Sequence, residues 1–158
     1  MVRNNEKNKI VFKEKLKTFC LAALNARLET ILEAMKNAQE SANNETKSSA
    51  GDKHETGRAM SQLENEMNAK QLLEITAELN TVQQIDVSKV NFKAVAGAFV
   101  ICKHDAFFII TGMGVQIVEE KKVVFLSPKA PLAVKLKEVM AGQNFEFNKI
   151  KFEVLEVF

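Results

Sequence analysis

The stretch that decides the fold is LAALNARLETILEAMKNAQESA, residues 21–42, in which apolar side chains recur at alternating spacings of three and four. The recurring residues are Leu21, Leu24, Leu28, Ile31, Met35, Ala38 and Ala42. This heptad spacing is typical of a helix whose apolar seam packs against another helix. The stretch therefore predicts a long helix that needs a partner.

A second apolar series follows further along the chain. Its members are Met60, Leu63 and Met67, and then Leu72, Ile75, Leu79 and Val82. The phase changes near Lys70, which predicts a stutter. Each helix would be about 30 residues long, or roughly 45 Å. We expect the two helices to form an antiparallel hairpin over residues 16–86 of a monomer, although an intermolecular coiled coil would use the same seam.

The segment between the two series is polar, and it predicts a hairpin tip near residues 47–56. Only small alanine side chains are apolar between Met35 and Met60. Gly51 suits a turn, and Asp52 followed three residues later by Glu55 suits the start of a helix. We expect this tip to stand clear of any core.

The composition changes after the hairpin. Nine of the eleven phenylalanines lie after residue 91, and both prolines lie after residue 110. Residues 87–158 alternate as short strands do. The expected strands are 98–102, 106–111, 115–118, 122–126, 145–147 and 150–157, with a helix from Pro131 to Gly142. The predicted class is α+β: a long helical hairpin followed by a small twisted antiparallel sheet covered by one helix.

Charge and composition exclude several classes of protein. No apolar run approaches the roughly 18 residues of a membrane span, and the N-terminus lacks the apolar core of a signal peptide. Residues 1–15 form a basic segment that precedes the expected hairpin. With only two cysteines, a disulfide framework is not expected. We therefore predict a cytoplasmic protein without membrane contact.

The tip acids have two compatible interpretations. Asp52 as N-cap and Glu55 at the third helical position would stabilise the helix start. Alternatively, two exposed carboxylates at the end of a long hairpin could complete a Mg²⁺ site held by another molecule, since Mg²⁺ needs few protein carboxylates. Lys47, Lys53 and Arg58 surround these acids, either as a balanced surface loop or as contacts to a phosphate backbone.

These motifs together resemble the Gre transcript-cleavage factors of bacterial RNA polymerase. The tip AGDKHE, residues 50–55, is similar to the Gly-Asp-x-x-Glu that this family carries at the end of a helical hairpin. The segment LSPKAPL, residues 126–132, and the closing FEVLEV, residues 152–157, look like the family's FKBP-like C-terminal domain. The order of parts agrees from about Leu16 to the end.

The resemblance implies a function and its residues. The protein would bind RNA polymerase through its secondary channel and stimulate the polymerase's own cleavage of backtracked RNA, without being an enzyme itself. Asp52 and Glu55 would help hold the second Mg²⁺ in the polymerase active site, and the protein would need no cofactor of its own. The resemblance also implies two groups of contact residues. Lys47, Lys53 and Arg58 would contact the RNA 3′ end, and Ser127, Pro128 and Pro131 would dock on the polymerase.

The chain departs from the family pattern just after the acids. The family has Asn after the Glu and Tyr three residues further on, whereas this chain has Thr56 and then Arg58 and Ala59, and it contains no Tyr. Two alternatives therefore stay open. One is a Gre-like regulator or inhibitor that binds the channel without stimulating cleavage. The other is an interaction module with an FKBP-like domain.

Overall fold

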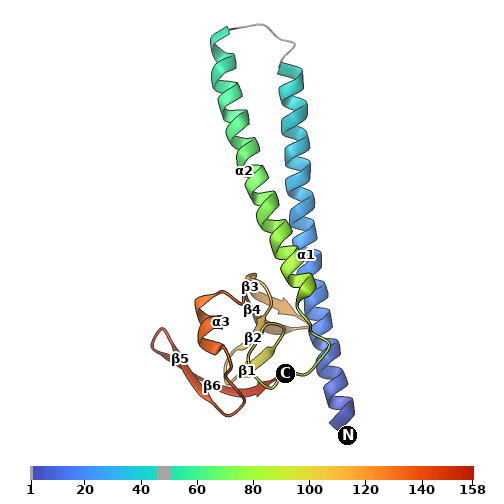
Figure 1. Ribbon diagram of the computed structural model, residues 1–158, viewed down its shortest axis with the longest axis vertical. Helices are drawn as coiled ribbons and strands as arrows, with labels where there is room; N and C mark the ends of the chain where they lie inside the picture. Colours follow the sequence, from blue (N-terminus) through green and yellow to red (C-terminus); the bar gives the residue numbers. More distant parts are fainter. Residues whose placement is uncertain (1, 46–50) are drawn as a thin grey trace. The chain divides into compact units, whose positions relative to one another are not determined.

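The structure is a computed structural model that describes residues 2–45 and 51–158, with side chains at 5–41 and 56–158. Two long helices precede a six-stranded sheet with one short helix, so the chain is α+β, as predicted (Figure 1). The helices are α1 (Val2–Glu45), α2 (Gly51–Gln84) and α3 (Pro131–Leu136). The strands are β1 (Phe99–Cys102), β2 (Ala106–Ile109), β3 (Gly114–Val118), β4 (Lys121–Leu126), β5 (Asn144–Phe147) and β6 (Ile150–Val157).

The chain divides into two compact units. The sheet unit contains residues 1–21 and 81–158, and the hairpin unit contains residues 22–80. The N-terminal part of α1 therefore belongs to the sheet unit, and α1 begins at Val2 rather than at the predicted Leu16. Residues 2–15, which the sequence suggested as a separate basic segment, continue this helix.

In the hairpin unit, α1 and α2 pack against each other as an antiparallel pair. Leu24 of α1 and Ile75 and Leu79 of α2 are buried. The Arg27 guanidinium lies 3.8 Å from the Glu78 carboxylate across the pair. These contacts confirm the predicted helical hairpin.

The predicted seam of α2 is wrong in its first half. Met60, Leu63 and Met67 are 69%, 59% and 55% exposed. The half-buried residues of this part of α2 are Gly57, Ser61, Asn65 and Asn68, which continue the series of Leu72, Ile75 and Leu79 backwards. Their spacings are 4, 4, 3, 4, 3 and 4, so the series runs past Lys70 without the break predicted there. The continuous helix keeps its phase, and the polar residues occupy the seam while the larger apolar ones face solvent.

The sheet has the strand order β3-β4-β2-β1-β6-β5. Four of its neighbouring pairs are antiparallel, but β2 and β4 are parallel, with Phe107 opposite Val124 and Ile109 opposite Leu126. The sheet is thus mostly antiparallel, as predicted, with one parallel pair. The reason is that the chain crosses from β2 to the edge strand β3 and then turns back, so that β4 lies between β3 and β2. Because β4 is antiparallel to β3, which runs opposite to β2, β4 runs parallel to β2.

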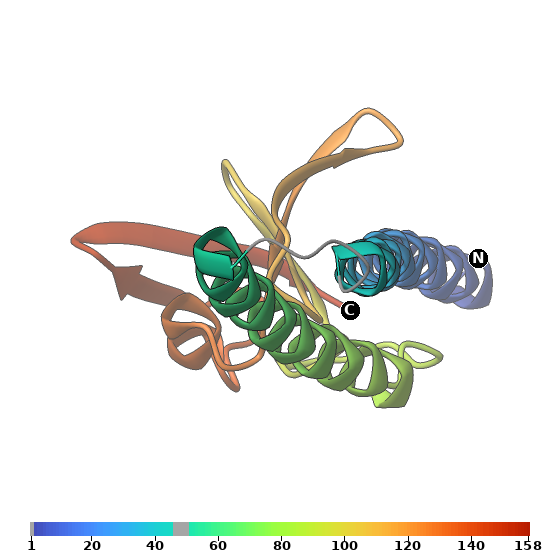
Figure 2. The ribbon, with the colours of Figure 1, turned by 90° about the horizontal axis from the view of Figure 1, so that it is seen from above.

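Helix α3 is shorter than predicted. Pro131 occupies its first turn, as expected, but the helix ends at Leu136 instead of extending to Gly142. Glu138 adopts a left-handed backbone conformation with φ of 66°. Ala94 donates its N–H to the Val139 carbonyl and accepts a hydrogen bond from the Glu138 N–H. This pairing of Glu138 and Val139 with Ala94 ends the helix. Helix α3 lies beside β5 (Figure 2).

The core of the sheet unit is rich in phenylalanine. Phe99, Phe108 and Phe125 are almost fully buried, and their rings contact one another edge-on or tilted. Helix α1 adds two rings: Phe12 lies 5.2 Å from Phe99 and Phe19 lies 5.9 Å from Phe125, between ring centroids. The first turns of α1 are therefore part of this core.

The last strand mostly follows its predicted alternation. Val154 and Val157 are buried and Leu155 is 53% exposed, so Val157 rather than Leu155 continues the inward face. Ile150 falls in the same alternating series as Phe152 and Val154 but is 58% exposed. It begins β6 next to a turn in which Asn148 and Lys149 both have positive φ, so it lies at the outer end of the β5–β6 hairpin.

Candidate functional site

The predicted tip acids lie at the start of the described part of α2. The backbones of Asp52 and Glu55 are helical, whereas their side chains, and that of Lys53, lie outside the described residues, as does Lys47 altogether. Residues three apart in a helix lie on the same face. The backbone therefore places both carboxylate-bearing positions on one face of α2, and Arg58, another three residues on, continues that row with an exposed side chain.

The predicted docking segment forms the turn that begins α3. The Ser127 Oγ accepts a hydrogen bond of 3.3 Å from the Lys129 N–H, and the Ser127 carbonyl accepts one of 2.9 Å from the Ala130 N–H. Ser127 and Pro128 are half-buried and Pro131 is exposed. These residues shape the helix start, and Pro131 is the one among them that presents most of its surface.

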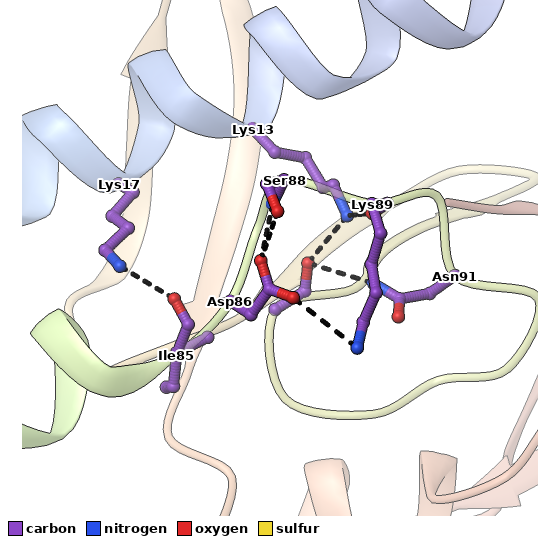
Figure 3. Close-up of polar contacts among 8 residues, drawn as sticks. Lys13, Lys17, Ile85, Asp86, Ser88, Lys89 and Asn91 are labelled. Carbon is purple, nitrogen blue, oxygen red and sulfur yellow. Dashed lines mark hydrogen bonds and ion pairs between the residues drawn. The ribbon is translucent and has the colours of Figure 1, made fainter.

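Sequence reasoning missed a lysine cluster that binds α1 to the segment after α2 (Figure 3). Lys13 is fully buried, and its Nζ donates to the Lys89 carbonyl at 2.7 Å and to the Gly97 carbonyl at 3.1 Å. The Asn91 side chain also donates to the Gly97 carbonyl, at 3.4 Å. One lysine thus connects backbone groups that are 76 and 84 residues away in sequence.

Burial lowers the pKa of Lys13 from 10.5 to about 8, because a charged ammonium loses its hydration there. Asp86 partly opposes this effect and Lys89 adds to it. The neutral amine keeps two N–H donors, which matches the two carbonyls around it. Lys13 therefore keeps both hydrogen bonds in either protonation state.

A second lysine holds the end of α2. The Lys17 Nζ donates to the Gln83 carbonyl at 2.9 Å and to the Ile85 carbonyl at 2.7 Å. Carbonyls at a helix C-terminus lack intrahelical partners, and a lysine there satisfies them. Next along the chain, the Asp86 carboxylate accepts hydrogen bonds from the Ser88 N–H and Oγ, which hold the pKa of Asp86 at about 2.

Gly97 lets the chain approach itself closely in this cluster. Its φ is +84°, and a Cβ at this position would lie 2.5 Å from the Asp86 backbone oxygen. No side chain fits at that distance without moving the backbone. Glycine is required here for both conformation and space.

The two cysteines are not candidate nucleophiles. Burial raises the pKa of Cys20 to about 12 and that of Cys102 to about 11, so both thiols stay protonated at neutral pH. Within the described part of the chain, no three His, Cys, Asp or Glu residues gather in a way that could hold a metal ion. Of the helices described, none combines the length and apolar character that crossing a membrane requires.

Comparison with known proteins adds no relative. No protein-family model matches the chain, and no curated protein has a significantly similar sequence.

Proposed function

We propose that this chain is a Gre-like transcription elongation factor. It binds bacterial RNA polymerase through the secondary channel and stimulates cleavage of backtracked RNA by the polymerase active site. The observation that carries the proposal is a long helical hairpin, ahead of a small sheet unit in sequence, whose second helix carries Gly51, Asp52 and Glu55 at its N-terminal end.

The dimensions of the hairpin unit support this proposal. The part of α2 within it, residues 51–80, is roughly 45 Å long at 1.5 Å per residue. Its outer half has a seam of small and amide side chains rather than large apolar ones. A narrow pair of helices with polar residues towards the tip suits entry into a water-filled channel.

In the proposed mechanism, Asp52 and Glu55 would supply carboxylate oxygens that help hold a Mg²⁺ ion in the polymerase active site. The donor set fits the ion, since Mg²⁺ commonly takes one or two protein carboxylates together with phosphate oxygens and water. When bound, this second Mg²⁺ would activate water and stabilise the leaving oxygen. The helix fixes the spacing of the two acids, which reduces the entropy lost when they bind.

The remaining candidate residues have proposed roles in binding the RNA and the polymerase. Lys47, Lys53 and Arg58 would pair with phosphates near the RNA 3′ end, as cations commonly do. Docking of the sheet unit on the polymerase would involve the turn that contains Ser127, Pro128 and Pro131. Of these last three, the exposed Pro131 offers the largest contact surface.

One observation favours a second candidate function. The chain has no tyrosine, and Thr56 and Arg58 follow the acids where the Gre pattern has Asn and Tyr nearby. A tip that lacks these groups could enter the channel without positioning RNA for cleavage. The second candidate is thus a channel-binding regulator or inhibitor.

The test uses stalled, backtracked elongation complexes with RNA labelled at its 3′ end. We expect the full chain to release short 3′ fragments, and the Asp52→Ala/Glu55→Ala variant to do so at least roughly tenfold more slowly, the lower end of effects seen when support for a metal site is removed. A matched control replaces two exposed carboxylates further along α2, Glu64→Ala/Glu74→Ala, and should cleave like the unmodified chain.

The outcomes separate the candidates. Full activity in the Asp52/Glu55 variant would show that the site assignment is wrong. If no fragments form but the chain displaces another secondary-channel binder, the regulator is the correct function. If it does not bind polymerase at all, both candidates are excluded.

A further inference from the structure

The sheet unit contains an open cavity of about 800 Å³ that neither the tip nor the docking turn uses. Its walls come from the first turns of α1, the turn between β1 and β2, and the β3–β4 hairpin. Its apolar lining consists mainly of Phe12, Phe99, Ile101, Cys102, Val123 and Phe158. All of these residues belong to the sheet unit.

The aromatic part of this lining is a packed cluster. Phe99 lies between two other rings, with centroid distances of 5.2 Å to both Phe12 and Phe158. Phe99 and Phe158 are nearly buried, whereas Phe12 is only half-buried. The cluster therefore gives the cavity a rigid apolar wall at which part of one ring stays accessible.

The remaining lining is mainly basic. It contains five lysines and three carboxylates, which leaves a net charge of +2 with His104 neutral. The lysines are Lys9, Lys15, Lys103, Lys121 and Lys122, and the acids are Asp105, Glu119 and Glu156. An anion in the cavity would meet a favourable potential on this side.

Three of the lysines are already held by neighbours. Lys15 Nζ lies 2.6 Å from the Glu119 carboxylate and Lys9 Nζ lies 2.5 Å from that of Glu156. Lys121 Nζ lies over the Phe12 ring, 5.0 Å from its centroid. The contacts neutralise two of the acids and hold α1 against the strands. They leave Lys103 and Lys122 as exposed cations whose side chains have no partner among the described residues.

The cavity thus combines an apolar, partly aromatic wall with free positive charge. Ligand sites in proteins have volumes of about 300–1,000 Å³ and pair an apolar lining with a few polar groups. We infer that this cavity binds a small organic anion that carries an apolar, flat group. The flat group lies against Phe12 and its neighbours, and the carboxylate or sulfonate pairs with Lys103 and Lys122.

The one thiol in the cavity lining is chemically inert. Cys102 is buried and its thiol remains protonated at neutral pH, because burial raises its pKa to about 11. No covalent step is therefore part of the inference. Binding would be reversible and would weaken as salt screens the exposed lysines.

A direct probe is 8-anilinonaphthalene-1-sulfonate, which has a flat apolar body, one sulfonate and a fluorescence that rises in apolar sites. We expect saturable binding of one molecule per chain with a dissociation constant in the micromolar range. The variant Lys103→Glu/Lys122→Glu should bind at least about tenfold more weakly, since charge reversal replaces attraction with repulsion. The control Lys135→Glu/Lys137→Glu makes the same charge change at exposed positions outside the cavity, and should bind like the unmodified chain.

Thermal unfolding of each variant confirms that it is folded before its titration is interpreted. The inference is overturned if the probe shows no saturable binding up to 1 mM, or if both charge reversals affect binding equally. An unlabelled peptide of alternating Asp and Leu, titrated by calorimetry, forms the second arm. If that peptide binds and depends on Lys103 and Lys122 while the small probe does not bind, the cavity takes an acidic protein segment instead. The test does not involve polymerase, so its result is independent of the proposed function.

Discussion

Polar side chains lie between packed elements at two places in this chain, with opposite results. In the lysine cluster of the sheet unit, buried Lys13 donates to two carbonyls and Lys17 to two more. In the outer seam of the hairpin unit, Asn65 and Asn68 are half-buried, and the Asn68 side-chain nitrogen is buried without a hydrogen-bond partner among the described residues.

The difference shows what a buried polar group does for a fold. A satisfied group fixes one arrangement, because any shift breaks its hydrogen bonds. An unsatisfied group costs about 1–3 kcal/mol and specifies nothing. We therefore expect the lysine cluster to be among the most rigid parts of the molecule and the outer hairpin to open locally first.

We expect the largest effect from Gly97→Ala, which tests the close packing of the lysine cluster. The new Cβ would meet the Asp86 backbone oxygen at 2.5 Å, in a backbone conformation that alanine disfavours. We expect the free energy of unfolding to fall by about 4 kcal/mol, from overpacking and left-handed strain together. Urea denaturation monitored by circular dichroism measures this change.

Gly114→Ala is the matched control, since Gly114 also has positive φ but a Cβ added there would meet no other atom within 4 Å. It should cost only the conformational part, about 1 kcal/mol. Equal losses in the two variants would show that the close approach at Gly97 contributes nothing, and would remove the contrast with the hairpin.

The next effect concerns the charge on Lys13. Its pKa is about 8 in the folded chain and 10.5 when the side chain is fully hydrated, as it is on unfolding, so between these values the unfolded chain binds more protons. The cost of burying the charge is fully present below pH 8 and is relieved as the pH rises to 10.5. This relief amounts to about 3 kcal/mol over the whole window.

Lys13→Met isolates this contribution. Above pH 9 the buried thiols of Cys20 and Cys102 stay protonated in the folded chain, which lowers its stability as the pH rises and so opposes the effect of Lys13. This opposing contribution is the same in the unmodified chain and in the variant. The stability of the unmodified chain should therefore rise relative to that of the variant between pH 8 and pH 10. Parallel stability curves, measured by urea denaturation across this range, would contradict the assignment.

The smallest expected effect lies in the hairpin seam, at Asn68→Leu. Leucine removes the unsatisfied amide and extends the apolar series that begins with Leu72. We expect the hairpin to gain about 1 kcal/mol, measured by hydrogen exchange of the α2 amides. Met67→Gln, at a 55% exposed neighbouring position, should change stability by less than about 0.5 kcal/mol. A loss of stability in Asn68→Leu would mean that the seam is assigned to the wrong face.

Much of the fold could be predicted from local pattern. The seam of α1 followed hydrophobic spacing, and the strands followed their alternation and their turns. The turn of Glu119 and Glu120 was expected between two strands, and both residues have the positive φ of a tight hairpin. The α2 seam could not be predicted, because Met60, Leu63 and Met67 are more apolar than the asparagines that occupy it.

Other features depend on contacts that are distant in sequence. A fully buried lysine is rare, so nothing near Lys13 indicates its partners 76 and 84 residues away. The parallel pairing of β2 with β4 depends on where β3 lies, which spacing does not encode. For the proposed tip site, sequence established the spacing of Asp52 and Glu55, and the helical backbone places both on one face.

The continuity of α1 through both units has a consequence for synthesis on the ribosome. The hairpin unit is one contiguous run of residues, 22–80, inserted between the two segments of the sheet unit. All of its contacts are available once residue 80 has emerged. The N-terminal part of α1, by contrast, finds its partners only later, since Phe12 contacts Phe99, which is itself paired with Phe158. Residues 2–21 are therefore made before the hairpin unit but belong to a unit that is completed after it.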